Sequence, residues 1–204
     1  MHVSTCLFIA LSLLSAALPA NAQNAELAAI HDADQAARST PAEIDWTVLL
    51  PEDRRRRERV QELLSAGEAR AAIDYYHAAM VFQHGENLDD FRLAHALSTI
   101  AMSLEPEEKQ YRWLTAASWD RIMATQLQPQ WYGTQFHSDD KGMFLYPVAD
   151  GVVSDEDRKA MQVPTLAETR ARLEELAKMN GQTVNPDPPT IEELRRARQA
   201  WSKD

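Results

Sequence analysis

Two histidines sit on apolar helical stripes of this sequence and could act on a proton. His84 follows His77 along one helical line, and His95 lies on the stripe that Phe91 begins. Imidazole is the side chain that most readily takes up and releases a proton near neutral pH. His84 or His95 is therefore a candidate general base.

Carboxylates and arginines with helical spacing could complete such a site. Asp120 interrupts an apolar face in the segment 113–124, next to Arg121, and Asp34 precedes Arg38 by one helical turn. A buried carboxylate is unfavourable unless it is paired or hydrogen-bonded. Asp120 or Asp34 could thus orient a histidine, while Arg38 or Arg121 could hold an anionic group in bidentate fashion.

A purely structural interpretation uses the same groups. Asp34 could pair with Arg38, and Asp120 with an arginine, so that these pairs fix the register of the helices. This interpretation is favoured, because buried polar networks are common, and whether the chain is an enzyme stays open. The candidate catalytic residues are His84, His95, Asp120 and Arg121.

The segment 128–136 combines three glutamines, three aromatic residues and a glycine. Its amides could recognise the polar edge of a ligand beside an aromatic pocket wall, or its rings could simply hold a loop against the core. Together with polar residues of earlier helices, this segment supplies the candidate ligand-binding residues Asp34, Gln35, Arg38, Gln83, Gln130, Tyr132 and Gln135.

Motifs for metals, nucleotides and activated serines are missing from the sequence. It has no HExxH, cysteine pair, EF-hand loop, P-loop, dinucleotide fingerprint or GxSxG. His77 and His84 would lie about 10 Å apart along a helix, and His137 to Asp140 are typical of an exposed polar turn. We expect neither a metal ion nor a cofactor.

The elements that must position these residues are mainly helices. Helices are expected over 24–38, 52–66 with Pro51 at the start, 69–84, 87–104 and 106–126, and two more after capping boxes at Thr165 and Thr190. Residues 143–146 and 152–153 are expected to pair across 149–151. The sequence thus predicts a mainly α fold of antiparallel helical hairpins with a small irregular or β-hairpin insert near 137–163. The spacing of Ala94, Ala101 and Pro106 is weakly similar to a tetratricopeptide repeat, although no second copy is in register.

The first 22 residues have the pattern of a cleaved secretory signal. An apolar run of about 12 residues, shorter than the roughly 20 of a membrane span, precedes Pro19 and a small-residue cleavage site. We expect an exported protein, periplasmic or secreted, with one helical domain over 23–180 and a linker and charged helix over 181–204. Its only cysteine, Cys6, lies in the signal, so a hydrophobic core must stabilise the mature chain.

The charge of the chain limits its partners. A net charge of −10 argues against nucleic acid and anionic membranes, and no second apolar stretch predicts stable membrane insertion. Four arginines at 54–57 point all round a helix among acidic neighbours, which is typical of a solvated helix face. The binding partner that we expect is therefore a protein or a small polar ligand.

Several motifs together resemble a bacterial family known only as a domain of unknown function. They are the DQxxR of residues 34–38, the QHG of residues 83–85, Asp120-Arg121 and the YGTQ of residues 132–135. The resemblance covers roughly residues 24–180. It implies a helical exported domain and no established activity.

Two functions follow as hypotheses. The first is a non-catalytic exported binding or interaction module that uses its helical hairpins and the glutamine-aromatic segment. The second is a hydrolase that uses a His/Asp/Arg general acid–base site around His84, Asp120 and Arg121.

Overall fold

The computed structural model describes residues 22–201. The predicted signal segment 1–22 therefore lies, apart from its last residue, outside the described residues. Within residues 22–201 the chain is mainly helical and carries one small antiparallel sheet, as expected.

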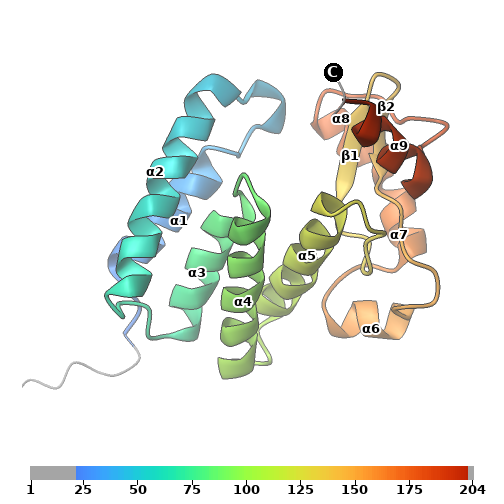
Figure 1. Cartoon of the computed structure of the whole chain (residues 1–204). Coiled ribbons are helices and arrows are strands. Elements are labelled where there is room, and N and C mark those ends of the chain that lie inside the picture. Colours follow the sequence, from blue (N-terminus) through green and yellow to red (C-terminus); the bar gives the residue numbers. More distant parts are fainter. Residues whose placement is uncertain (1–21, 202–204) are drawn as a thin grey trace, which may run out of the picture.

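Five longer helices form the first part of the fold, with a short 3-10 helix η1 (Pro41–Glu43) between the first two. Successive helices run antiparallel and lie side by side (Figure 1). They are α1 (Ala25–Ala36), α2 (Trp46–Ser65), α3 (Ala72–Gln83), α4 (Leu88–Leu104) and α5 (Lys109–Thr125).

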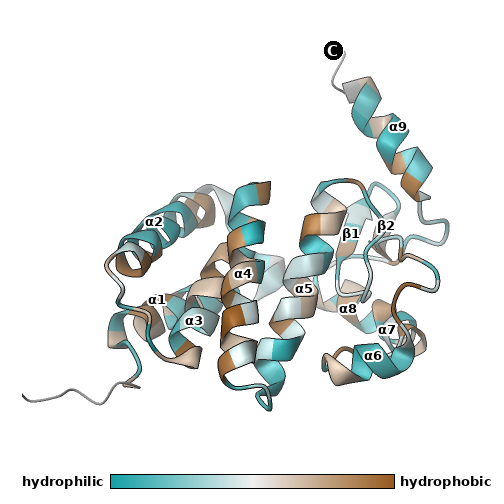
Figure 2. Cartoon of the chain, turned by 60° about the horizontal axis from the view of Figure 1, so that its bottom comes forward, coloured by the Kyte–Doolittle hydropathy of each residue, from teal (hydrophilic) through white to brown (hydrophobic). Residues whose placement is uncertain are grey.

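The remaining elements lie beyond α5 in Figure 1. They are strands β1 (Phe136–Asp139) and β2 (Gly142–Leu145) and helices α6 (Asp155–Ala160), α7 (Leu166–Ala171), α8 (Leu173–Met179) and α9 (Ile191–Trp201). The strands pair from Phe136 with Leu145 to Asp139 with Gly142. Helix α9 points outward in Figure 2, and Arg195 and Arg198 connect it to the end of α5 through hydrogen bonds to Leu127 O and Thr125 O.

Helix α3 is the centre of the hydrophobic core. Its apolar residues are buried nearly all round, as expected of a helix enclosed by others. Leu27 of α1, Val60 of α2, Ala94 of α4 and Leu114 of α5 pack in the same cluster. The end of α3, which carries Gln83 and leads into His84, is therefore surrounded by other helices.

Side-chain caps define most of the helix starts. Asn24 and Asn87 each accept hydrogen bonds from two backbone N–H groups of the first turn. The boxes at Thr165 and Thr190 also form, because each threonine exchanges hydrogen bonds with a glutamate three residues later. These local signals were correctly predicted.

Two local predictions were wrong. Helix α2 begins at Trp46, because Asp45 accepts a hydrogen bond from the backbone of Thr47, and Pro51 lies inside the helix at the loss of one backbone hydrogen bond. The hairpin closes at Gly142 instead of at 149–151. Asp139 Oδ1 accepts hydrogen bonds from the backbone N–H groups of residues 141 and 142, and the positive φ of Gly142 (130°) favours glycine.

Three further expectations can be compared with the described residues. The tetratricopeptide-like resemblance is not confirmed. The arginine run is only partly a solvated face, because Arg57 is buried and ion-pairs with Glu86. The third expectation is a linker that begins at residue 181. Its segment 181–185 lies against the sheet, since the Met143 N–H donates to Thr183 O and the Asn185 N–H donates to Met143 O.

Of the helices in residues 22–201, none is both long and apolar enough to cross a membrane.

Candidate functional site

A histidine and a buried aspartate form the centre of the candidate site. Asp34 of α1 has no exposed surface, and His84, the C-cap of α3, donates from Nδ1 to Asp34 Oδ2 over 2.8 Å. Arg38 and Gln35 also donate to this carboxylate, each over 2.8 Å. Burial alone would raise the pKa of Asp34, but the hydrogen bond from His84 and the charges of His84 and Arg38 hold it below its usual range.

This geometry orients the imidazole. With Nδ1 donating to Asp34, His84 presents Nε2 without a hydrogen-bond partner among the described residues. The side chain of His84 is 21 % exposed, so solvent reaches the ring. Nε2 is therefore available to bind a ligand or to accept a proton.

A second buried carboxylate, which the sequence reasoning missed, extends the network. Asp53 of α2 is buried and accepts hydrogen bonds from Arg38 and from Arg56, the latter over 2.6 Å. Its position on the buried stripe of Leu49, Arg57 and later residues of α2 was the available signal. Arg38 thus joins α1 to α2 through two carboxylates.

Arg121 of α5 differs from the other partly or fully buried arginines. Arg158 donates to three backbone carbonyl oxygens and to Asp155, and Arg57 pairs with Glu86. Arg121 donates only from Nε, to Gln135 Oε1 over 3.1 Å, and its Cζ lies 5.6 Å from the Phe91 ring centroid. Within residues 22–201 its two Nη groups have no acceptor and no acidic side chain lies within ion-pair distance.

The electrostatics mark Arg121 as an uncompensated cation. Burial, and next the charge of Arg38, lower the pKa of Arg121. Burial and the charge of Arg121 in turn lower the pKa of His137. Arg38 and Arg56 pair with the carboxylates of Asp34, Asp53 and Glu52, whereas Arg121 forms no ion pair with any described residue. Arg121 is therefore the guanidinium group here whose charge no carboxylate matches by contact.

Asp120 has a different environment from the one expected. It is fully buried, and it accepts hydrogen bonds from the backbone N–H groups of Trp131, Tyr132 and Thr134 and from the Thr134 hydroxyl, over 2.8 to 3.2 Å. The expected arginine partner for Asp120 was wrong, because these four donors satisfy the carboxylate. Asp120 fixes the loop after α5 and forms no ion pair with Arg121.

The glutamines hold the same loop in place. Gln130 is fully buried, donates to Gln135 O and Tyr146 O, and accepts from the Gln135 N–H. Gln135 donates to Ala117 O, which leaves its Oε1 for Arg121. Gln130 therefore has a structural environment, whereas Gln135 positions the guanidinium of Arg121.

The remaining predicted residues lie apart from this network. His95 Nδ1 faces Thr115 O at 3.1 Å and Ser118 Oγ at 3.2 Å, and burial lowers the pKa of His95. Tyr132 lines the same small pocket as His95, beside Trp119 and Trp131. Gln83 is buried, and its Oε1 has no hydrogen-bond partner in the described part of the chain.

Among the residues that the structure describes, no three His, Cys, Asp or Glu side chains gather in a way that could hold a metal ion. The site as it stands offers an oriented imidazole and cationic N–H donors.

Comparison with known proteins adds no relative: no protein-family model, no curated protein and no solved structure matches the chain. The resemblance to a bacterial family of unknown function stays a prediction.

Proposed function

We propose that this chain is an exported, non-catalytic binding module for a small anion that carries a carboxylate or phosphate group. Arg121 and Arg38 would supply charge and N–H donors to the anion, and His84 Nε2 would add a further contact. The signal-like pattern in residues 1–22 supports export.

The observation that carries this proposal is the state of Arg121. A partly buried cation without a counter-ion is unfavourable, and a second guanidinium nearby makes it more so. An anion bound between the two arginines would relieve both effects. Guanidinium presents planar pairs of N–H groups that match the oxygens of carboxylate and phosphate.

Access and preorganisation support the same conclusion. The side chains of Arg38 and His84 are 16 % and 21 % exposed, so each can contact a ligand from solvent. Asp34 holds both of them, and Gln135 holds Arg121. Groups that are held before binding lose little conformational entropy when the ligand arrives.

A second candidate function is hydrolysis, which the Asp34–His84 pair favours. Asp34 stabilises the Nδ1–H tautomer, so Nε2 could take a proton from an attacking water molecule while Arg121 stabilises the developing negative charge. Asp34 takes the orienting role in this scheme, because Asp120 is already satisfied by the loop.

Thermal unfolding with added anions tests the binding proposal. Phosphate or succinate, compared with sodium chloride at equal ionic strength, should raise Tm. At a concentration of about 100 Kd the stabilisation is about 2.7 kcal/mol, or roughly 5–10 °C for a domain of this size. Arg121→Met should abolish the rise. Arg92→Met is the matched control, because Arg92 is exposed and, as far as the structure describes the chain, ion-pairs with Asp89 alone.

A Tm that responds to these anions no more than to chloride would contradict the proposal, as would an undiminished rise in Arg121→Met. Hydrolysis of p-nitrophenyl acetate or p-nitrophenyl phosphate by the wild type, and its loss in His84→Gln, would favour the hydrolase instead.

A further inference from the structure

Two neighbouring cavities lie beside Trp113 of α5 and share no lining residue with the arginine site. The outer groove, of about 500 Å³, lies between α6 and α7 and is lined by Lys159, Gln162, Val163, Pro164, Glu168 and Arg172. The inner cavity, of about 170 Å³, is also lined by Val163, Pro164 and Arg172. Because three residues line both, the two cavities adjoin at these residues.

The inner cavity has a mainly apolar wall. Trp113 of α5, Phe136 of β1 and Leu176 of α8 face it. An apolar cavity of about 150 Å³ is large enough for one benzene molecule, so the inner cavity has the volume of a single aromatic ring. Trp113 is 40 % exposed, which leaves a large apolar ring at the edge of the site in contact with water.

One polar group in this wall has no partner. Thr169 of α7 is 6 % exposed and lines the inner cavity, yet its hydroxyl makes no hydrogen bond with any described residue. Its oxygen is not among the fully buried side-chain atoms that lack a partner, so it is open to the cavity. The Thr169 hydroxyl can therefore donate to, or accept from, a ligand held in the cavity.

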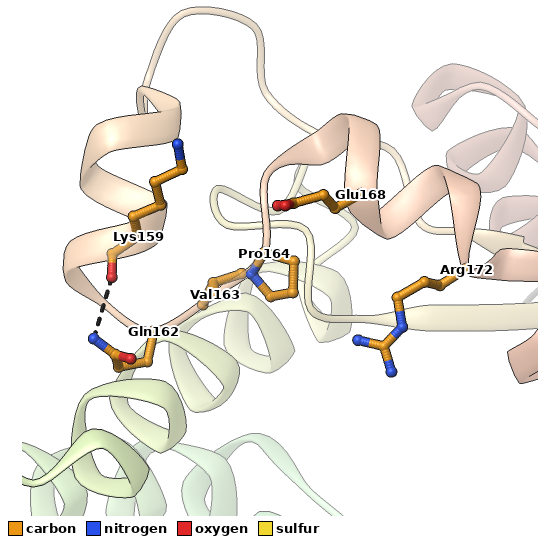
Figure 3. Close-up of a pocket in the computed structure, with 6 residues that line it drawn as sticks. All are labelled: Lys159, Gln162, Val163, Pro164, Glu168 and Arg172. Atoms are coloured by element: carbon orange, nitrogen blue, oxygen red, sulfur yellow. Dashed lines mark hydrogen bonds between the residues drawn. The ribbon is translucent and has the colours of Figure 1, made fainter.

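The outer groove adds positive charge at the mouth of the cavity. Figure 3 shows Val163 and Pro164 at its centre, with Lys159 on one side and Glu168 and Arg172 on the other. Glu168 Oε2 accepts hydrogen bonds from the backbone and hydroxyl of Thr165 over 2.8 and 2.7 Å, and the negative charge of Glu168 interacts with Lys159. Arg172 is left as the second positive charge of the groove. The side chains of Lys159 and Arg172 have no acceptor among the described residues.

We propose that the joined cavities bind a small amphipathic anion: one aromatic ring in the inner cavity, and a carboxylate on a short chain that reaches Arg172 at its mouth. The apolar wall excludes a purely polar anion, and the unpaired cation at the rim selects against a neutral hydrocarbon. Thr169 orients the ligand through its free hydroxyl. This site is independent of the Arg121 site.

Isothermal titration with 3-phenylpropionate tests this site. The wild-type protein should bind it, and should bind 3-phenylpropanamide, which has the same shape without the charge, about tenfold more weakly. Arg172→Gln should reduce the affinity for the acid to that for the amide. Thr169→Leu, which fills the inner cavity, should abolish the binding of both.

The controls separate this site from the other one. Arg170→Gln, which removes a nearby exposed arginine that lines a different pocket, should leave the affinity unchanged. The titrations are repeated in an Arg121→Met background, which removes the carboxylate site proposed above and should leave binding in the joined cavities unchanged. No binding up to about 10 mM, equal affinity for acid and amide, or unchanged affinity in Arg172→Gln would each overturn the proposal. Loss of binding in Arg121→Met would also overturn it, since the acid would then occupy the arginine site. Because Arg172 is an exposed residue, Arg172→Gln remains a decisive variant even if Thr169→Leu does not fold.

Discussion

Replacing Asp120 by asparagine separates a structural role of this residue from a catalytic one. Asn keeps one acceptor oxygen and turns the other into an N–H donor. In the wild type, Oδ1 receives the N–H of Trp131, and Oδ2 receives the N–H and the hydroxyl of Thr134. The hydroxyl can rotate and accept from the new donor, but the backbone N–H of Thr134 would be left facing another N–H.

The magnitude follows from these bonds. Each hydrogen bond to a charged acceptor contributes about 1.5–3 kcal/mol, and a buried donor left without a partner costs about 1–3 kcal/mol. Burial raises the pKa of Asp120 despite its hydrogen bonds, so removing the charge recovers part of this loss. We expect a net destabilisation of about 2–4 kcal/mol, or roughly 5–15 °C in Tm.

Urea and thermal unfolding followed by circular dichroism measure this change. Asp140→Asn is the matched control, because Asp140 is exposed in the turn between the strands, and its Tm should not move. A Tm for Asp120→Asn equal to or above that of the wild type would refute the reasoning. It would show that the carboxylate is held at a cost to stability, as catalytic groups often are.

Two further substitutions test the buried network and the pH dependence. Asp34→Asn should destabilise the protein by about 2–4 kcal/mol, because it weakens the hydrogen bonds that Asp34 accepts from Arg38, Gln35 and His84, while Arg38 keeps Asp53 as a counter-charge. Urea unfolding would measure this, with the exposed Asp32→Asn as control, and a loss below about 1 kcal/mol would show that Asp34 is dispensable. His77 has a pKa lowered to about 4 by burial and by the charge of His31, against the opposing charges of Asp32 and Asp74. The unfolded chain therefore binds a proton first, and stability is lost as the pH falls from about 6.5 toward 4. His77→Leu should remove about 2 kcal/mol of the stability difference between about pH 7.5 and pH 5, and an unchanged difference in urea midpoints would assign it to other groups.

The local parts of the fold could be predicted because their signals lie within a few residues. Asn87 caps α4 through N–H groups two and three residues ahead, and Thr165 forms its box with Glu168. The helical spacing of Asp34 and Arg38 likewise predicted their ion pair. Where the local signal was ambiguous, as at Pro51, the competing cap at Asp45 determined the start of the helix.

The partners of the site residues depended on which helices pack together. His84 hydrogen-bonds to Asp34, which is 50 positions away in the chain. Asp120 was expected to pair with an arginine, but it accepts hydrogen bonds from a loop that begins 11 residues later. A sequence pattern shows which side of a helix a residue occupies. It does not show which other helix covers that side.

By itself, the sequence determined the helical class, most of the helix caps and the short list of polar residues placed among apolar ones, because these depend on composition and on spacing within one or two turns. Only the tertiary structure decided that Arg121 has no counter-ion among residues 22–201 and that Trp113, Phe136 and Thr169 enclose a common cavity. Residues that lie far apart in the chain form each of these two features together. Their physical cause is the packing of several helices at once, which no single segment encodes.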